Sequence, residues 1–237
     1  MADYDIFAPF YDLLMGDRSD VVEIIQKQVI KYTPQATSML ELGCGTGSIL
    51  SSFGNMHQLA GIDLSSNMLQ IAQQKLPQSI FKQGTIAGFE LGQSFDVIVC
   101  VFDTLNHLML LSDWQKTFIS AKKHLKDRGI FIFDIDTISR LQALAASSGY
   151  TQELPNDSIA ELMIEKTGNA KVRWHIRIQE TQSNDVIQVY EDYVYETSFP
   201  LKSVEHEIRK NFEILSTFDS AGAIPSEQSE RIYFVCR

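Results

Sequence analysis

Short runs with the apolar character of strands alternate with longer, amphipathic segments along the first 140 residues. The runs that predict strands cover residues 39–42, 58–62, 80–83, 95–101 and 130–135. Segments 18–31 and 112–126 carry apolar residues at helical spacing instead. Run 95–101 is apolar almost throughout, as expected for a parallel strand that is buried on both faces. The alternation predicts an α/β fold, with a parallel sheet between layers of helices.

The pattern changes after residue 150. Residues 170–180 and 185–197 alternate between apolar and polar side chains, and a turn at 183–185 separates them, which predicts a two-stranded antiparallel ribbon. A helix at 201–209 and strands at 212–218 and 231–236 are predicted to complete the chain. We expect the last two strands to form an antiparallel hairpin.

The most informative stretch is residues 39–47, Met-Leu-Glu-Leu-Gly-Cys-Gly-Thr-Gly. It predicts a buried strand that enters a tight turn and opens a helix, and its glycines let the backbone approach a ligand closely. A nicotinamide or flavin fingerprint is Gly-x-Gly-x-x-Gly, whereas here the third glycine comes one residue early and Ser48 stands where a glycine is needed. Glu41 at the strand end is a poor neighbour for pyrophosphate. Its carboxylate suits a positively charged ligand such as S-adenosylmethionine.

Four separated motifs in order extend this observation. They are 39–47, 61–65 (Gly-Ile-Asp-Leu-Ser), 95–100 (Phe-Asp-Val-Ile-Val-Cys) and 129–134 (Gly-Ile-Phe-Ile-Phe-Asp). Over roughly residues 1–140 the chain resembles the class I S-adenosylmethionine-dependent methyltransferases, whose first motif is Glu/Asp-x-Gly-x-Gly-x-Gly. The resemblance implies S-adenosyl-L-methionine as cofactor. It also implies a Rossmann-like, seven-stranded mixed sheet with an antiparallel C-terminal hairpin and a small β insertion after strand five.

The chain is long enough for one α/β domain, so residues 1–237 are predicted to form a single methyltransferase domain. Within it we expect four regions. These are an N-terminal helical flap (1–35), a cofactor-binding core (36–136), a helix and antiparallel β insertion over the acceptor site (137–200), and a C-terminal helix with strands six and seven (201–237).

The resemblance also implies roles for individual residues. Tyr11 belongs to a Tyr-Asp-x-x-Met stretch, as in many small-molecule methyltransferases, and is expected to reach the methionine carboxylate. Asp63, at the end of the second strand, is expected to bind the ribose hydroxyls; the alternative is a helix N-cap, which Ser65 or Ser66 can also supply. Thr85 stands where related enzymes often have an aspartate near the adenine. The predicted cofactor-binding residues are Tyr11, Glu41, Gly43, Gly45, Gly47, Asp63, Leu64, Met68, Thr85, Ile86, Cys100, Val101 and Phe102.

The acceptor is expected beside residues 101–108, because ligands of open α/β sheets lie outside the carboxyl ends of the strands. His107 is the histidine nearest this place and the candidate general base. The other predicted acceptor-binding residues are Asp103, Asn106, Asp134, Trp174 and Tyr193. Two alternatives stay open: Asp134 can cap the following helix, and the aromatic side chains of the ribbon can pack across strands.

Charge and cysteine content exclude several other classes. The chain has 20 basic and 30 acidic residues and a net charge of −10, which argues against nucleic acid or an anionic membrane surface as partner. Three cysteines without Cys-x-x-Cys spacing suggest neither a disulfide framework nor a zinc site, and no metal is predicted. No apolar run is long enough to span a membrane. We expect a cytoplasmic protein and name a homodimer as its candidate assembly.

The predicted function is transfer of a methyl group from S-adenosylmethionine to nitrogen, oxygen or carbon of a small molecule by in-line displacement. Two alternatives are a non-catalytic S-adenosylmethionine-binding protein and an RNA or protein methyltransferase. The Asn/Asp/Ser-Pro-Pro-Tyr/Phe signature of many nucleic-acid amino-methyltransferases is absent after strand four, where residues 102–105 are Phe-Asp-Thr-Leu. A nicotinamide-dependent oxidoreductase is disfavoured by the glycine spacing.

Overall fold

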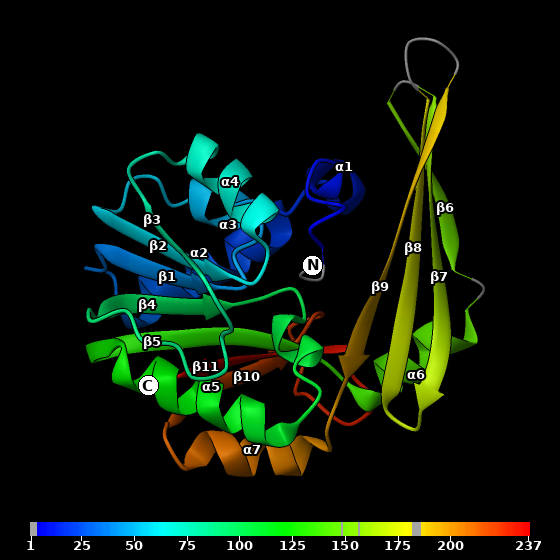
Figure 1. The fold of residues 1–237 in the computed structure, drawn as a ribbon. Coiled ribbons are helices and arrows are strands. Elements are labelled where there is room, and N and C mark those ends of the chain that lie inside the picture. Colours follow the sequence, from blue (N-terminus) through cyan, green and yellow to red (C-terminus); the bar gives the residue numbers. More distant parts are fainter. Residues whose placement is uncertain (1–3, 148, 156, 182–185) are drawn as a thin grey trace.

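The structure is a computed structural model, and it describes residues 4–147, 149–155, 157–181 and 186–237. A seven-stranded sheet lies at its centre (Figure 1), with strand order β10-β11-β5-β4-β1-β2-β3. The parallel strands are β1 (Ser38–Leu42), β2 (Gln58–Asp63), β3 (Ile80–Gln83), β4 (Phe95–Cys100) and β5 (Leu125–Asp136). The chain order reverses at β1 and β4, so the carboxyl ends of these strands flank a crevice.

Helices cover both faces of this sheet because its central strands are apolar on both faces. Met39, Val97 and Ile130 pack on one side with α2 (Ser19–Tyr32) and α3 (Ser48–Ser51), near α4 (Ser66–Lys75). Leu40 and Phe131 pack on the other side against α5 (Leu111–Lys123) and α7 (Leu201–Arg209). Both layers are therefore specified by the alternation of side chains along each strand.

The C-terminal strands complete the sheet in the antiparallel direction. β11 (Arg231–Cys236) pairs with β5, and β10 (Ile214–Asp219) pairs with β11, both antiparallel. The predicted seven-stranded mixed sheet with an antiparallel C-terminal hairpin is confirmed.

A second, four-stranded sheet follows β5 and α6 (Ile138–Ala146). It has the order β6 (Tyr150–Leu154), β7 (Ser158–Gly168), β8 (Lys171–Thr181) and β9 (Ile187–Thr197), all antiparallel. The predicted antiparallel ribbon is present as β8 and β9. It is half of a four-stranded sheet, because strands β6 and β7 were missed. In β7 the outward Ile159 and Met163 are apolar and exposed, and they mask the alternation of the buried positions. The predicted turn at 183–185 lies outside the described residues.

The N-terminal segment lies between the two sheets (Figure 1). It includes α1 (Tyr11–Met15), and its Phe7 and Phe10 are buried against Leu162, Ile176 and Val194 of the insertion sheet. The insertion sheet therefore packs against this segment and holds it beside the crevice. No helix among the described residues is long and apolar enough to cross a membrane.

Candidate active site

The glycine turn between β1 and α3 follows the backbone path that its sequence predicts. Gly43 and Gly45 have φ angles of 71° and 49°, which is left-handed backbone that favours glycine. A Cβ atom on Gly43 would lie 2.3 Å from the methyl carbon of Thr104, and one on Gly45 would lie 3.4 Å from the Tyr11 ring. Gly47 (φ 73°) precedes α3 as its N-cap. The turn thus needs glycine both for its backbone and for the closeness of its neighbours.

Asp63 is fixed beside this turn by two backbone N–H groups. Gly45 donates to its Oδ2 at 2.8 Å, and Ser65 donates to its Oδ1 at 2.9 Å. The N-cap of α4 is Ser65, whose hydroxyl oxygen accepts from the Met68 N–H at 3.1 Å, so the alternative that Asp63 is the cap does not hold. Burial raises the pKa of Asp63, against the lowering effect of the N–H donors. A carboxylate has about four acceptor sites, so Asp63 retains capacity for hydroxyl donors in the cavity.

One cavity at the carboxyl ends of the strands joins most of the predicted residues. Nine predicted cofactor residues line it: Tyr11, Gly43, Gly45, Asp63, Leu64, Met68, Thr85, Ile86 and Phe102. Asp103 and His107 from the predicted acceptor side line the same cavity, as does Tyr4. Cys100 and Val101 do not line it, because their side chains are buried in the core of the sheet. The hydroxyl of Thr85 accepts the Ala87 N–H at 3.1 Å.

Two side chains of opposite charge lie behind the turn. Glu41 is 3% exposed and its Oε2 has no hydrogen-bond partner among the described residues. Burial raises its pKa to about 8, while the Arg18 guanidinium opposes the shift. Arg18 lies 4.8 Å from the centroid of the Tyr11 ring and 5.3 Å from that of Phe102, and its Nη2 also has no hydrogen-bond partner there. A ligand with both an ammonium and a carboxylate group would satisfy both.

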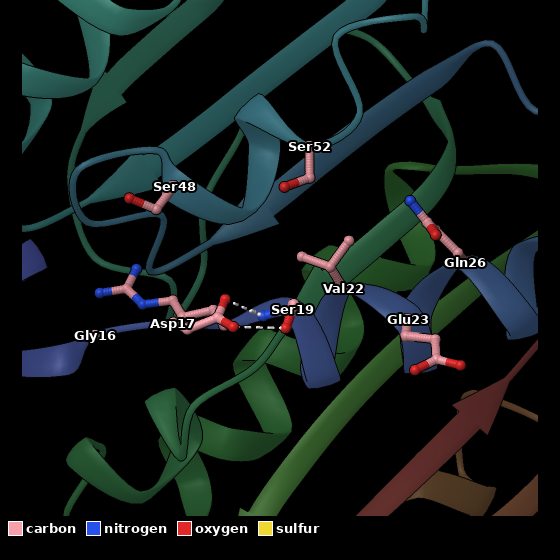
Figure 2. A pocket seen from close by; sticks show the side chains of 9 residues that line it. Gly16, Asp17, Ser19, Val22, Glu23, Gln26, Ser48 and Ser52 are labelled. Atoms are coloured by element: carbon pink, nitrogen blue, oxygen red, sulfur yellow. Dashed lines mark hydrogen bonds between the residues drawn. The ribbon is translucent and has the colours of Figure 1, made fainter.

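Arg18 was missed in the sequence, where it precedes a predicted helix without any motif. The only signal was a basic residue just after the Tyr-Asp-x-x-Met stretch of an acidic chain. Arg18 is not among the residues that line the first cavity, but it lines a second hollow between the start of α2 and α3. Figure 2 shows the polar lining of this hollow, in which the Ser19 N–H and hydroxyl donate to Asp17 at 2.9 and 2.8 Å. No predicted site residue lines this second hollow.

The N-terminal segment is held over the turn by polar contacts. Oδ1 of Asp12 accepts from the hydroxyls of Thr46 at 2.6 Å and Ser48 at 2.9 Å, and its Oδ2 pairs with Lys75 at 2.5 Å. These contacts fix Tyr11 at the cavity wall. Burial raises the pKa of the Tyr11 phenol to about 12, so the hydroxyl keeps its proton and can donate to an anionic group.

Two predicted acceptor residues instead build the loop that follows β4. Asp134 is fully buried and accepts the backbone N–H groups of Phe102 at 3.0 Å and Asp103 at 2.7 Å. It thereby holds both residues at positive φ, 58° and 50°. Asn106 is also fully buried, and its amide hydrogen-bonds the backbone of Asp136 and Thr197 at 2.8 to 3.0 Å. Both side chains are used in this loop, and neither is among the residues that line the cavity. Their contact with the acceptor stays a prediction.

The two predicted aromatic residues of the insertion face opposite ways. Trp174 pairs with Val194 on the face that packs against the N-terminal segment. Tyr193 pairs with His175 on the other face, where the two rings stack at 4.6 Å and Tyr193 is 41% exposed. The stacking of Tyr193 on His175 favours the cross-strand alternative, and its contact with the acceptor stays a prediction. The register of β8 and β9 decides on which face each side chain lies.

Arg231 provides the positive charge beside the acceptor end. It forms an ion pair with Asp103, and its Nε lies 2.8 Å from Asp136 Oδ1. Its Nη1 lies 3.6 Å from Asp134 Oδ2. Burial nevertheless raises the pKa of Asp134 to about 6 and that of Asp136 to about 7. Arg231 was also missed, because the topology brings strand β11 beside β5 only in the folded chain.

The fold and the cavity together define a protein of the nucleoside-cofactor-binding α/β class. The family described as "Methyltransferase domain" matches residues 39–129. "Putative methyltransferase YqeM" of Bacillus subtilis (strain 168) is 30% identical, covering 98% of this chain and 95% of the relative. A Streptomyces venezuelae protein, "dTDP-3-amino-3,4,6-trideoxy-alpha-D-glucopyranose N,N-dimethyltransferase", is 29% identical over 50% of this chain and 49% of its own.

A solved structure has a similar fold over the whole chain. It is the crystal structure of an S-adenosylmethionine-dependent methyltransferase from Clostridium acetobutylicum ATCC 824, with a TM-score of 0.86 and 21% identity, covering 100% of this chain and 99% of that one. The chain belongs to the class I S-adenosylmethionine-dependent methyltransferases. The oxidoreductase alternative is thereby excluded. The residues present fit the cofactor, because Glu41 Oε2 and Arg18 Nη2 make no hydrogen bond among the described residues and can complement its amino-acid end. Arg18 Nη2 also lies 3.8 Å from Asp12 Oδ1, and neither Glu41 nor Arg18 is among the residues that line the cavity.

Proposed function

We propose that this enzyme methylates a small-molecule acceptor inside the cavity between the N-terminal segment and the strand ends. The main supporting observation is that the N-terminal segment partly covers the cavity. Tyr4 and Tyr11 line it from the N-terminal side, and the insertion sheet packs on that segment from behind. A partly covered cavity with aromatic side chains in its wall limits the access of water and accommodates a small substrate. The name of the Streptomyces venezuelae relative, which specifies a sugar nucleotide, supports the same class of acceptor.

The cofactor supplies a methyl group activated on a sulfonium. For its amino-acid end we propose Glu41 as partner of the ammonium and Arg18, with the Tyr11 hydroxyl, as partners of the carboxylate. The Asp63 carboxylate would accept hydrogen bonds from the ribose, and the apolar Met68 and Ile86 would contact the adenine. These residues fix one reactant, and holding two reactants in an attack geometry supplies about 7–11 kcal/mol of the barrier.

On the acceptor side we propose contacts from Asp103 and His107, which line the same cavity. The role of His107 as general base stays a prediction, as do a contact from Trp174, a cytoplasmic location and a homodimer. The division into flap, core, insertion and C-terminal region is proposed as the functional organisation of one domain.

The acceptor class is tested with methyl-labelled S-adenosylmethionine and a dialysed cell extract to which its separated low-molecular-mass fraction is returned. We expect the label in low-molecular-mass products, and we expect Asp63→Ala to reduce it in parallel with cofactor affinity, measured by calorimetry. Label recovered in RNA or protein instead would refute the small-molecule proposal and favour the macromolecular alternative.

A further inference from the structure

Glu196 has its carboxyl group near the acceptor end of the cavity, and no sequence pattern indicates it as a site residue. Strand β9 places Glu196 beside Asp103 and His107, and one polar atom from each of these residues lies within 4.8 Å of the other two. An atom placed between such a trio lies within hydrogen-bond distance of all three. Asp103 and His107 line the cavity, so this position adjoins the acceptor space.

Glu196 is buried without a full set of partners. It is 4% exposed, and its Oε2 makes no hydrogen bond within the described part of the chain. The indole N–H of Trp174 is near enough to favour the carboxylate but makes no hydrogen bond of normal geometry. Burying an unpaired carboxyl group costs several kcal/mol in general, so the arrangement is best explained by a partner that arrives with the substrate.

The surrounding charges indicate what that partner is. Arg231 faces the carboxylates of Asp103, Asp134 and Asp136, and Arg140 lies 3.9 Å from Asp136. With Glu196, four carboxyl groups therefore face two guanidinium groups. Burial is the main cause that raises the pKa of Glu196, and the negative charges of Asp103 and Asp136 raise it further, whereas Arg231 opposes them. The cluster therefore lacks positive charge. A cationic ligand supplies it.

A backbone contact indicates which ring nitrogen of His107 can accept a hydrogen bond. Its Nδ1 lies 3.1 Å from the backbone carbonyl oxygen of Tyr195, which can only accept, so Nδ1 carries the proton and Nε2 has the lone pair. Nε2 lies 3.4 Å from the Tyr4 hydroxyl. A primary ammonium has three N–H donors, which matches two carboxyl groups and one imidazole nitrogen.

We infer that Glu196, with Asp103 and His107, binds the acceptor nitrogen, that the acceptor is therefore a basic amine, and that Glu196 receives the ammonium proton. This inference rests on the proposed methylation of a small molecule. One N–H proton passes to the Glu196 carboxylate and leaves a neutral amine with a free electron pair. That pair forms the new N–C bond as the C–S bond breaks, giving a methylated ammonium and neutral S-adenosylhomocysteine.

Glu196 suits this role better than His107 because of the charges that remain in the site after proton transfer. In a buried site, a neutral amine beside a neutral carboxylic acid avoids the desolvation cost of an ion pair. The raised pKa of Glu196 favours the same neutral pair. Proton transfer to His107, which is only partly buried, would instead create an imidazolium and leave the buried Glu196 ionised. His107 is then a residue that orients the amine.

The test compares Glu196→Gln with a matched variant, Glu207→Gln. Glu207 is also buried, at 6% exposure, but it lies on α7 and pairs with Lys210 at 2.7 Å. The acceptor probes are dTDP-3-amino-3,4,6-trideoxy-α-D-glucopyranose and benzylamine, each with its hydroxyl counterpart. We expect methylation of amines and not of alcohols, and we expect Glu196→Gln to lower kcat/KM about 100-fold near neutral pH. Glu207→Gln should leave kcat/KM unchanged. The Kd for S-adenosylmethionine should be the same in both variants and in the parent.

Raising the pH provides a readout that a structural role would not give. As pH approaches the pKa of the acceptor ammonium, more amine arrives neutral, so the deficit of Glu196→Gln should shrink. A deficit that is constant with pH would assign Glu196 a packing role and overturn the inference. So would loss of activity on chelation that a divalent ion restores, because it would assign the trio to a metal.

The inference and the proposed function fail in different ways. O- or C-methylated low-molecular-mass products in the extract experiment would overturn the amine assignment and leave small-molecule methylation intact. The amine assignment would also be overturned if the parent enzyme methylated a hydroxyl counterpart but neither amine. Label in macromolecules would remove both.

Discussion

Replacing Glu41 by glutamine should stabilise the cofactor-free protein while it weakens cofactor binding. Glutamine has nearly the same shape as glutamate and cannot ionise. Glu41 lies on β1 with 3% exposure, and its Oε2 has no hydrogen-bond partner among the described residues. Burial raises its pKa to about 8, and the nearby Asp63 carboxylate adds to the shift. The folded protein therefore resists the ionised form that the unfolded chain prefers near neutral pH.

The sign follows from proton uptake. An unfolded glutamate ionises near a pKa of about 4.3, whereas folded Glu41 holds its proton up to about pH 8. Its contribution to stability is fully present below the unfolded pKa and is lost as pH rises through the folded one. The loss is about 1.4 kcal/mol per pH unit within that window. Between about pH 5.5 and about pH 7.5, the variant should therefore gain about 2.7 kcal/mol on the parent.

The assay is urea unfolding of both proteins across this pH range. Other buried acids with raised pKa, such as Asp134 and Asp136, are present in both proteins and cancel in the difference. Saturating S-adenosylmethionine should flatten the pH slope of the parent, because its ammonium favours ionised Glu41. The affinity of the variant for this cofactor should fall about 10- to 100-fold, the usual loss for a hydrogen bond to a charged group. If the difference in unfolding free energy between the variant and the parent does not change with pH, the reasoning is refuted.

Two further variants test the glycine turn and the amino-acid end. Gly43→Ala should lower the free energy of unfolding by about 1–3 kcal/mol, because its Cβ would lie 2.3 Å from the Thr104 methyl carbon; adding Thr104→Ala should recover part of this loss, and no recovery would show that backbone strain dominates. Arg18→Met should lower the affinity for S-adenosylmethionine about 10- to 100-fold, as measured by calorimetry. The affinity for 5′-methylthioadenosine, which lacks the amino-acid group, should not change. Equal losses for both ligands would contradict a carboxylate contact.

The strands and the cofactor turn were predictable because they depend on local rules. The burial of β4 on both faces follows from its consecutive apolar residues 97–100. The path at Gly43 and Gly45 needs backbone angles that favour glycine. Asp63 was found because a fixed spacing from the glycines places it at the end of the neighbouring strand. Such features require only the residue types and the fact that parallel strands end at one edge.

Pairings between distant segments were decided by the tertiary structure. Arg231 reaches Asp103 only because β11 inserts beside β5, and Glu196 reaches His107 only through the register of β9 in a four-stranded sheet. A shift of one residue in β9 would exchange its two faces, and no local pattern distinguishes Glu196 from the exposed Glu191. Sequence alone therefore determined the class of enzyme and the frame of its cofactor site. The charges around the acceptor depend on strand order and register, which long-range packing fixes.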